Sequence, residues 1–516
     1  MKLKSFKIFT VILLILCFFS CEEKEDTAKA IVEIEATAPI ISVSEIAETI
    51  EVLTTIDISV SDNTENVNTT ISINGNNVFT TTQNQFSYDI DPFEFPNGAT
   101  NLVISAIDED GNETVKSFQF ISNRLLFQGD EGYSSDTVDS YLAINLESSG
   151  ELIAFRKLIG YEDLAFYANN EFEKQNLIIT NYLVNVDDGS VSARSYSDVK
   201  PSTILKNRDE VLNLLGLDQN RVNKNSEFNI EIQEAISYSL FYTLGFEYSF
   251  GQSNNNNFNI RYDNESANDV FLYHHTNDNL NLLDDYRYLY TESFEDQTMN
   301  FGDLTKLIPE NVATITFSED VKNFNFTLFG FSDDYAYKEF RMRLLYSFSG
   351  STEENGFVLD YPIINEYQYN QKSLSYSSYG KSVHLERKEL NDLDIPNWNV
   401  IKNESTVEIT GDYDFSELTY IVDYSSTDNR TALIFRYQSL FKESIIIPFD
   451  KLEIPLEIVN SLNGIGVNLE STSSNSKLSI TLTQFENIMD YPNGVFYQPI
   501  ANEVGDVTKV TFPLNN

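Results

Sequence analysis

The sequence is poor in the residues that support disulfides and imidazole chemistry. Its 516 residues include two cysteines, one tryptophan and three histidines. Both cysteines, Cys17 and Cys21, precede the body of the chain, so the body can form no disulfide and must be stabilised by packing. Nucleophilic catalysis would have to use a hydroxyl group together with His274, His275 or His384.

Basic residues are also scarce. The chain has 34 Lys and Arg against 79 Asp and Glu, which gives a formal net charge of −45. Binding to nucleic acid or to anionic lipid headgroups requires a basic face, so this balance argues against both partners. Strong acidity favours solubility but specifies no ligand.

The sequence lacks the usual catalytic and metal motifs. It contains no G-x-S-x-G, H-E-x-x-H or P-loop pattern, so we assign no catalytic residue, metal or cofactor. His274 and His275 would point to opposite faces of a strand, which favours a solvated or edge pair over a metal site. A carboxylate pair for glycoside hydrolysis cannot be tested among 79 acidic residues.

The N-terminus has the pattern of an export signal. Lys2, Lys4 and Lys7 precede the apolar run 8–19, which is too short to span a bilayer and ends at Ser20-Cys21. A small residue directly before a cysteine resembles the lipobox of bacterial lipoproteins. The resemblance implies a signal peptide over 1–20 and lipidation, including palmitate, at Cys21; the alternative is an ordinary cleaved signal.

An acidic segment follows the cysteine. Residues 22–26 (EEKED) resemble the export tag of Bacteroidetes outer-membrane lipoproteins. The resemblance implies an acidic tether over 21–36 and a protein held on the outer membrane by its lipid, facing the cell exterior; a periplasm-facing anchor is the alternative. Asp26-Thr27-Ala28 and Asp136-Thr137-Val138 match a short O-glycosylation pattern of the same group.

Residues 37–122 alternate apolar and polar side chains with period two, which predicts half-buried strands. Asn74-Gly75 predicts a hairpin turn, and about seven short strands at this spacing favour a β-sandwich. The end of the segment, NGATNLVISAIDEDGNETVKSFQF, resembles bacterial immunoglobulin-like repeats. Such modules often act as spacers. Asp108, Asp110 and Asn112 favour a hairpin turn over a calcium loop, since no EF-hand glutamate or helix follows.

The remainder, 123–516, predicts a larger, mostly β region, which we expect to be of sandwich type. Residues 141–146 and 152–155 predict a hairpin, and 177–184 a buried strand. One short helix is expected near 202–216, where apolar residues recur at helical spacing. The polar stretch 220–228 is a possible boundary between two modules.

Aromatic residues supply the candidate ligand contacts. Tyr286, Tyr288 and Tyr290 form one cluster, and Trp398 lies in a loop-like stretch. Exposed, these rings would suit a glycan or protein ligand; buried, they would be packing residues.

We therefore expect a lipid-anchored, non-enzymatic surface protein with a role in binding, adhesion or the cell envelope. The immunoglobulin-like module would be a spacer for a β region that binds protein or glycan. The alternative is a carbohydrate-active enzyme on a β scaffold.

Overall fold

A computed structural model describes most of the chain after the N-terminal 36 residues. Cys21, the tether and the Asp26-Thr27-Ala28 pattern lie outside the described residues. No helix in the described part is long and apolar enough to cross a membrane. The described residues are 37–129, 137–158, 164–205, 226–233, 240–242, 257–262, 269–275, 283–293, 295–317, 321–333, 336–337, 342–351, 356–378, 380–388, 396–425, 428–447, 451–467, 469, 476–485 and 506–514.

The chain folds into two compact units. The first contains Thr55–Asp89, Thr100–Phe120 and the residues up to Ala47, and the second contains Glu48–Thr54, Ile90–Ala99 and everything from Ile121 onward. Most of the immunoglobulin-like range thus belongs to the first unit.

The immunoglobulin-like range forms two sheets, as the alternation predicts. Asn74 and Gly75 have φ of 50° and 82° at the turn between β4 (Val67–Ile73) and β5 (Asn76–Thr81), the left-handed pair that the Asn-Gly signal requires. The three-stranded sheet has the order β1 (Ile40–Val43), β3 (Thr54–Ser61), β6 (Gln85–Ile90), and the five-stranded sheet has the order β2 (Thr49–Ile50), β8 (Glu113–Ser122), β7 (Gly98–Asp108), β4 (Val67–Ile73), β5 (Asn76–Thr81).

The core of this β-sandwich comes from alternate residues of both sheets. Ile56 and Ile58 on β3, with Ile71 on β4 and Ile104 on β7, are at most 3% exposed. Their polar neighbours along each strand face outward. The first unit therefore has a hydrophobic core of its own, stabilised without a disulfide.

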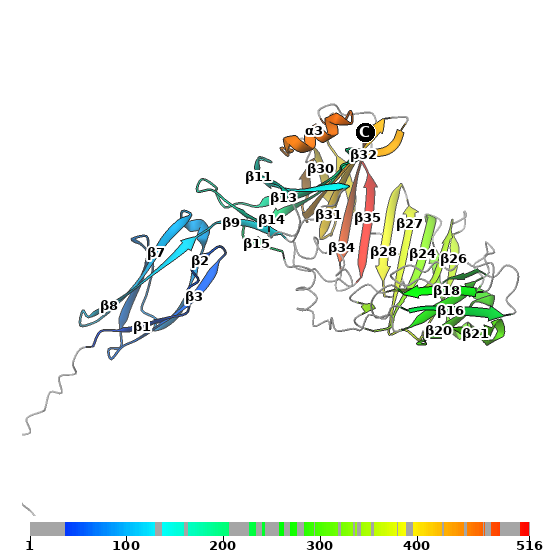
Figure 1. Ribbon diagram of the computed structural model, residues 1–516, viewed down its shortest axis with the longest axis horizontal. Helices are drawn as coiled ribbons and strands as arrows, with labels where there is room; N and C mark the ends of the chain where they lie inside the picture. The colour runs from blue at the N-terminus through cyan, green and yellow to red at the C-terminus, as the bar shows by residue number, and fades with distance from the viewer. Residues whose placement is uncertain are drawn as a thin grey trace, which may run out of the picture. The chain divides into compact units, whose positions relative to one another are not determined.

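The second unit is built on a twelve-stranded sheet (Figure 1). All neighbouring pairs are antiparallel except β14 (Val191–Val199) and β32 (Asp428–Leu440), which are parallel. Its order is β11 (Leu152–Leu158), β10 (Val138–Leu146), β13 (Leu177–Asn185), β14 (Val191–Val199), β32 (Asp428–Leu440), β31 (Phe415–Ser425), β34 (Ser476–Phe485), β35 (Val507–Pro513), β28 (Lys381–Arg387), β27 (Tyr369–Ser378), β24 (Lys322–Phe331), β25 (Arg343–Gly350).

Smaller elements complete the second unit. The sheets are β12 (Leu164–Tyr167), β9 (Leu125–Gly129), β15 (Thr203–Ile204); β18 (Asn257–Tyr262), β16 (Ser226–Gln233), β21 (Gln297–Asn300); β17 (Leu240–Tyr242), β19 (Val270–His275), β20 (Arg287–Thr291), β22 (Thr305–Lys306); β23 (Val312–Phe317), β26 (Phe357–Pro362); and β29 (Asn399–Lys402), β30 (Thr406–Thr410), β33 (Ser444–Ile446). Among the described residues, the helical elements are α3 (Leu456–Gly464) and the 3-10 turns η1 (Pro92–Glu94), η2 (Leu283–Asp285), η3 (Phe301–Asp303) and η4 (Pro309–Asn311).

Near one end of the large sheet, strand β13 packs into hydrophobic clusters on both faces. On β13, Ile178 and Tyr182 pack into the largest core cluster, while Leu177 and Ile179 pack into a second cluster on the opposite face. A continuous apolar run is the expected sequence for such a strand. The predicted buried strand is confirmed, as is the hairpin of β10 and β11.

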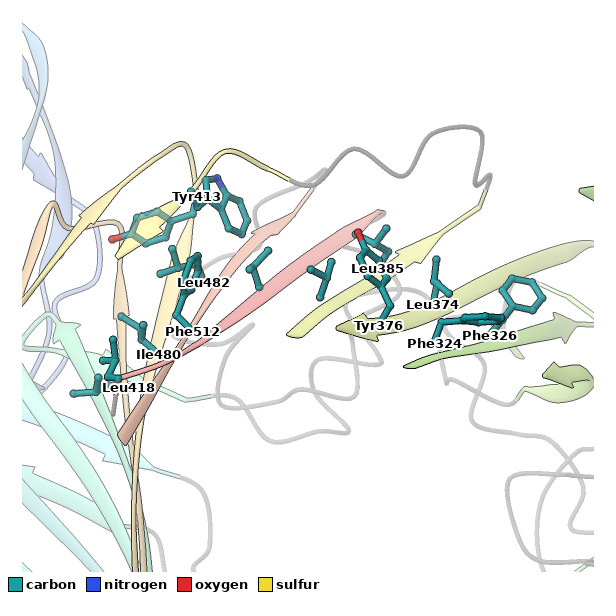
Figure 2. Close-up of a cluster of buried hydrophobic side chains, with 14 of the residues drawn as sticks. Phe324, Phe326, Leu374, Tyr376, Leu385, Tyr413, Leu418, Ile480, Leu482 and Phe512 are labelled. Carbon is teal, nitrogen blue, oxygen red and sulfur yellow. The ribbon is translucent and has the colours of Figure 1, made fainter. Parts of the chain in front are cut away.

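The other section of the sheet, β24, β27, β28, β35, β34 and β31, buries its apolar side chains on one face. Leu374, Leu385 and Leu482 lie on that face with other side chains of the largest core cluster (Figure 2). β23, β26, β19, β20, the β29–β30–β33 sheet and α3 contribute residues to the same cluster. The opposite face carries Asn325, Thr327, Ser373, Ser375, Ser377, Ser382, His384, Glu386, Lys509, Thr511, Ser479, Thr481, Thr419 and Glu417, which we call the polar face.

The helix expected near 202–216 is not found at its predicted start. Thr203–Ile204 instead forms β15, paired in parallel with β9, because tertiary pairing outweighs local helical periodicity. Residues 206–216 lie outside the described part, as do most residues of the possible boundary at 220–228. The α-helix that the structure describes is α3, which buries Ile458 and Leu462.

Candidate functional site

Trp398 is a packing residue. It is 3% exposed, its Nε1 donates to the carbonyl oxygen of Asp412 at 2.9 Å, and its ring lies edge-on to Tyr413. Gly411 has φ of +137°, and a Cβ there would stand 2.2 Å from the Trp398 ring. The tryptophan therefore fills a gap in the core and offers no ring face to a ligand.

The tyrosine cluster is also mostly buried. Tyr286 and Tyr288 are 1% and 6% exposed; Tyr286 donates to the carbonyl oxygen of Leu345 and Tyr288 to Glu366. Burial raises the pKa of both phenols above its usual value. Tyr290 is only half-buried, and burial together with nearby acidic groups raises its pKa to about 12. The ligand role proposed for Tyr286 and Tyr288 is thus corrected: Tyr286, directly before β20, and Tyr288 on β20 both pack into the largest core cluster.

In the acidic turn after β7, the side chains hydrogen-bond to one another. Both carboxylate oxygens of Asp108 accept hydrogen bonds from Asn112, at 2.7 Å from its backbone N and 2.8 Å from its Nδ2. The side-chain bond from Asn112 lowers the pKa of Asp108. The segment is a hairpin turn, as favoured from the sequence, and the carboxylate of Asp108 accepts its hydrogen bonds from within the turn.

His274 is buried on β19, where it contacts the ring of Phe301 edge-on and the carbonyl oxygen of Asp285 through Nδ1. Burial lowers its pKa. Among the described residues, no group of three or more His, Cys, Asp or Glu is placed to hold a metal ion. Thr137, the described acceptor of the glycosylation pattern, is exposed.

A groove lies on the three-stranded sheet of the first unit. Its volume is about 590 Å³. Ser42 pairs with Ser59 across β1 and β3, and Ser87 on β6 donates to the Asp57 carboxylate at 2.7 Å. The lining residues are Ser42, Val43, Ser44, Asp57, Ile58, Ser59, Gln85, Phe86 and Ser87.

We call this surface the hydroxyl groove. Its polar side chains are four serine hydroxyls, one carboxamide and one carboxylate, from β1, β3, β6 and the residue after β1; these are Ser42, Ser44, Ser59, Ser87, Gln85 and Asp57. Val43, Ile58 and Phe86 alternate with them toward the sandwich interior. The groove offers many neutral hydrogen-bonding groups and no basic side chain among its lining residues.

A second constellation lies on the polar face. Ser375 on β27 stands opposite His384 on β28, and their Oγ and Nδ1 atoms are 2.7 Å apart. On the other side of the imidazole, Nε2 is 2.9 Å from Oε1 of Glu386. Burial alone raises the pKa of Glu386, but the hydrogen bond and charge of His384, with the nearby Lys509 and Arg387, bring it below the usual value.

Neither surface was identified from sequence motifs. The hydroxyl groove joins residues from three separate strand segments, so no local pattern marks it. The sequence could have predicted the second constellation. Locating the turn after Ser378 fixes the register of the hairpin, and that register places Ser375 opposite His384.

No protein-family model matches the chain, and no curated protein matches it significantly. Several solved structures resemble it weakly. SGBP-B of the Bacteroides ovatus mixed-linkage glucan utilization locus, in complex with a mixed-linkage heptasaccharide, is 11% identical over 64% of this chain and 93% of that one, with a TM-score of 0.16. The fibronectin(III)-like modules of Clostridium thermocellum CbhA are 16% identical over 32% of this chain and 92% of theirs, with a TM-score of 0.14.

The FN1–FN3 domains of chicken CNTN1 are 6% identical over 66% of this chain and 93% of theirs, with a TM-score of 0.14. Scores at this level carry no inference about what this chain binds or does. The mainly β fold is evident from the strands themselves, with an immunoglobulin-like sandwich followed by the larger β unit.

Proposed function

We propose that this protein is a lipid-anchored binding protein of the bacterial cell surface, and that its hydroxyl groove takes a neutral glycan. The hydroxyl groove is the observation that carries the proposal. Its serine hydroxyls, the Gln85 carboxamide and the Asp57 carboxylate are the donors and acceptors that sugar hydroxyls pair with. A volume of about 590 Å³ suits a ligand of a few sugar rings.

Charge favours a neutral ligand over an anionic one. The polar lining residues include one carboxylate, Asp57, and no lysine or arginine to pair with a phosphate, sulfate or uronate. The chain as a whole carries a net charge of −45, which repels anions at longer range. A protein ligand with a basic or neutral face is the competing partner.

The anchor is a separate part of the proposal. The lipobox-like Ser20-Cys21 and the acidic segment 22–26 support export and display outside the outer membrane. Protease shaving of intact cells tests display: we expect digestion of the protein alongside control surface proteins. Protection until the outer membrane is permeabilised would place it in the periplasm.

The glycan proposal is tested with the full-length chain on a glycan array, followed by calorimetric titration of any hit. Ser59→Ala and Gln85→Ala each remove one hydrogen-bonding group, and we expect each to weaken binding about tenfold, the effect of one hydrogen bond. Ser72→Ala on β4 is the matched control, since Ser72 is a half-buried hydroxyl on the other sheet.

Unchanged affinity in both groove variants would exclude the hydroxyl groove as the site. An array without hits, combined with specific capture of a protein, would favour the protein ligand. The enzyme alternative receives no support from this groove, because glycoside hydrolysis uses two carboxyl groups and the lining includes one.

A further inference from the structure

The polar face carries a hydrogen-bonded Ser–His–Glu chain that the proposed binding role does not use. Ser375 Oγ lies 2.7 Å from His384 Nδ1, and His384 Nε2 lies 2.9 Å from Glu386 Oε1. Both distances fall within hydrogen-bond reach for a nucleophile, its base and the group that orients the base. All three side chains project from paired strands, whose ladders fix their positions.

The direction of the hydrogen bonds suits proton abstraction from Ser375. An ionised Glu386 accepts, so the imidazole carries its proton on Nε2 and leaves Nδ1 to accept from the serine hydroxyl. Gln371 lies 5% exposed beside the carboxylate, and its Nε2 is 3.4 Å from the second oxygen of Glu386. The carboxylate is thereby held, and it in turn fixes the orientation of the imidazole.

Two further groups flank the serine and histidine along the same row of the sheet. Asn325 on β24 is in register with Ser375, and Lys509 on β35 is in register with His384. The Oδ1 atom of Asn325 accepts from Ser349 at 3.0 Å, which leaves its amide N–H groups for a ligand at Ser375. Neighbouring strands are about 4.8 Å apart, so the amide lies close enough to donate to an oxygen beside the Ser375 hydroxyl.

Accessibility limits the size of the substrate. The His384 side chain is 32% exposed and Ser375 is half-buried, so solvent reaches both. Serine and threonine side chains surround them on the polar face, and these offer no apolar pocket for a long acyl chain. The row therefore fits a short acyl group better than a lipid.

We propose that Ser375 is the nucleophile of a site that cleaves esters of short acyl groups such as acetate. His384 acts as general base, Glu386 orients it, and Asn325 donates to the developing oxyanion. The polar face is distinct from the hydroxyl groove, so this activity and the proposed glycan binding can each be present without the other.

The reaction proceeds in two steps. In the first, Ser375 Oγ bonds to the acyl carbon, its proton passes to His384 Nδ1, and the alcohol leaves with that proton. In the second, water bonds to the acyl carbon and gives its proton to His384 Nδ1. Ser375 then leaves the acyl carbon and recovers the proton, and the carboxylic acid is released.

The test uses the folded full-length chain with a fluorophosphonate probe and with p-nitrophenyl acetate. We expect phosphonylation at Ser375, located by fragmentation of its tryptic peptide, and steady release of nitrophenol. Ser375→Ala should abolish both signals. His384→Asn should reduce both rates on the order of 100-fold, the usual contribution of a general base.

Ser373→Ala and Ser377→Ala are the matched controls, because both serines lie on the polar face of β27 beside Ser375. They should keep wild-type labelling and hydrolysis, and thermal unfolding confirms that each variant is folded. No adduct at Ser375 in the folded wild-type chain, or Ser375→Ala labelling as fast as wild type, would overturn the proposal. Glycan binding measured on Ser375→Ala separates this outcome from that of the hydroxyl groove.

Discussion

β13 and β27 are strands of one sheet, yet they differ in how many of their faces are covered by packed side chains. On β13 both faces pack into hydrophobic clusters, through Ile178 on one side and Ile179 on the other. On β27, Leu374 is buried, whereas the adjacent Ser375 belongs to the polar face. One sheet can thus be packed on both faces at one strand and leave a polar face open to solvent at another, depending on what covers its second face.

The strongest test of this difference removes side chains from both faces of each strand. Ile178→Ala and Ile179→Ala should each lower the free energy of unfolding by about 2–5 kcal/mol, since both leave cavities. On β27, Leu374→Ala should cost a similar amount. Ser375→Ala, which removes one half-buried hydrogen bond to His384, should cost about 0.5–1.5 kcal/mol. Urea denaturation measures all four; a small loss for Ile179→Ala would mean that the second face of β13 is not tightly packed.

An effect of similar size is expected when a buried ion pair is compared with an exposed one. Arg343 and Asp269 lie 3.4 Å apart with side chains 6% and 2% exposed, and Tyr367 donates to the same carboxylate. Arg343→Met should cost about 3–5 kcal/mol, because it leaves a buried charge without its cation. Lys477→Met, which removes an exposed partner of Asp423, should cost about 0–1 kcal/mol. Equal losses of unfolding free energy for Arg343→Met and Lys477→Met would mean that burial does not set the contribution of these ion pairs.

A smaller effect is expected at the packed tryptophan. Gly411→Ala places a Cβ against the Trp398 ring in a left-handed backbone conformation, so we expect a loss of about 1–3 kcal/mol. Gly380→Ala is the control for backbone strain alone, since its φ is +77° and a Cβ there meets nothing within 4 Å. A loss at Gly411 no greater than at Gly380 would show that Trp398 adjusts without cost.

The smallest effect is a pH dependence confined to the polar face. The pKa of Glu386 is lowered in the folded protein, so its ionised form stabilises the fold above its unfolded pKa, about 4.3. That contribution is lost as the pH falls through the lower, folded pKa. Wild type should therefore lose more stability than Glu386→Gln between pH 6 and pH 3, each compared by urea denaturation. An equal loss of unfolding free energy in wild type and Glu386→Gln over this pH range would argue against the His384–Glu386 interaction.

Strand patterns made much of the fold predictable. The alternation at Ile56 and Ile58 and the Asn74-Gly75 turn specified the immunoglobulin-like sandwich locally, because each signal acts within one hairpin. The candidate aromatic site was less predictable. Tyr286 and Trp398 carry the same ring chemistry whether exposed or buried, so composition cannot separate a ligand platform from a core.

By itself the sequence determined that the body after Cys21 has no disulfide, the strong negative charge, the mainly β class and the lipobox-like signal that predicts an anchor at Cys21. Each of these depends on composition or on neighbours along the chain. Only the tertiary structure decided which rings are buried, that β1, β3 and β6 form the hydroxyl groove, and that Ser375 meets His384 and Glu386. Those features depend on strand pairing and layer packing between distant segments, whose register and burial no local pattern specifies.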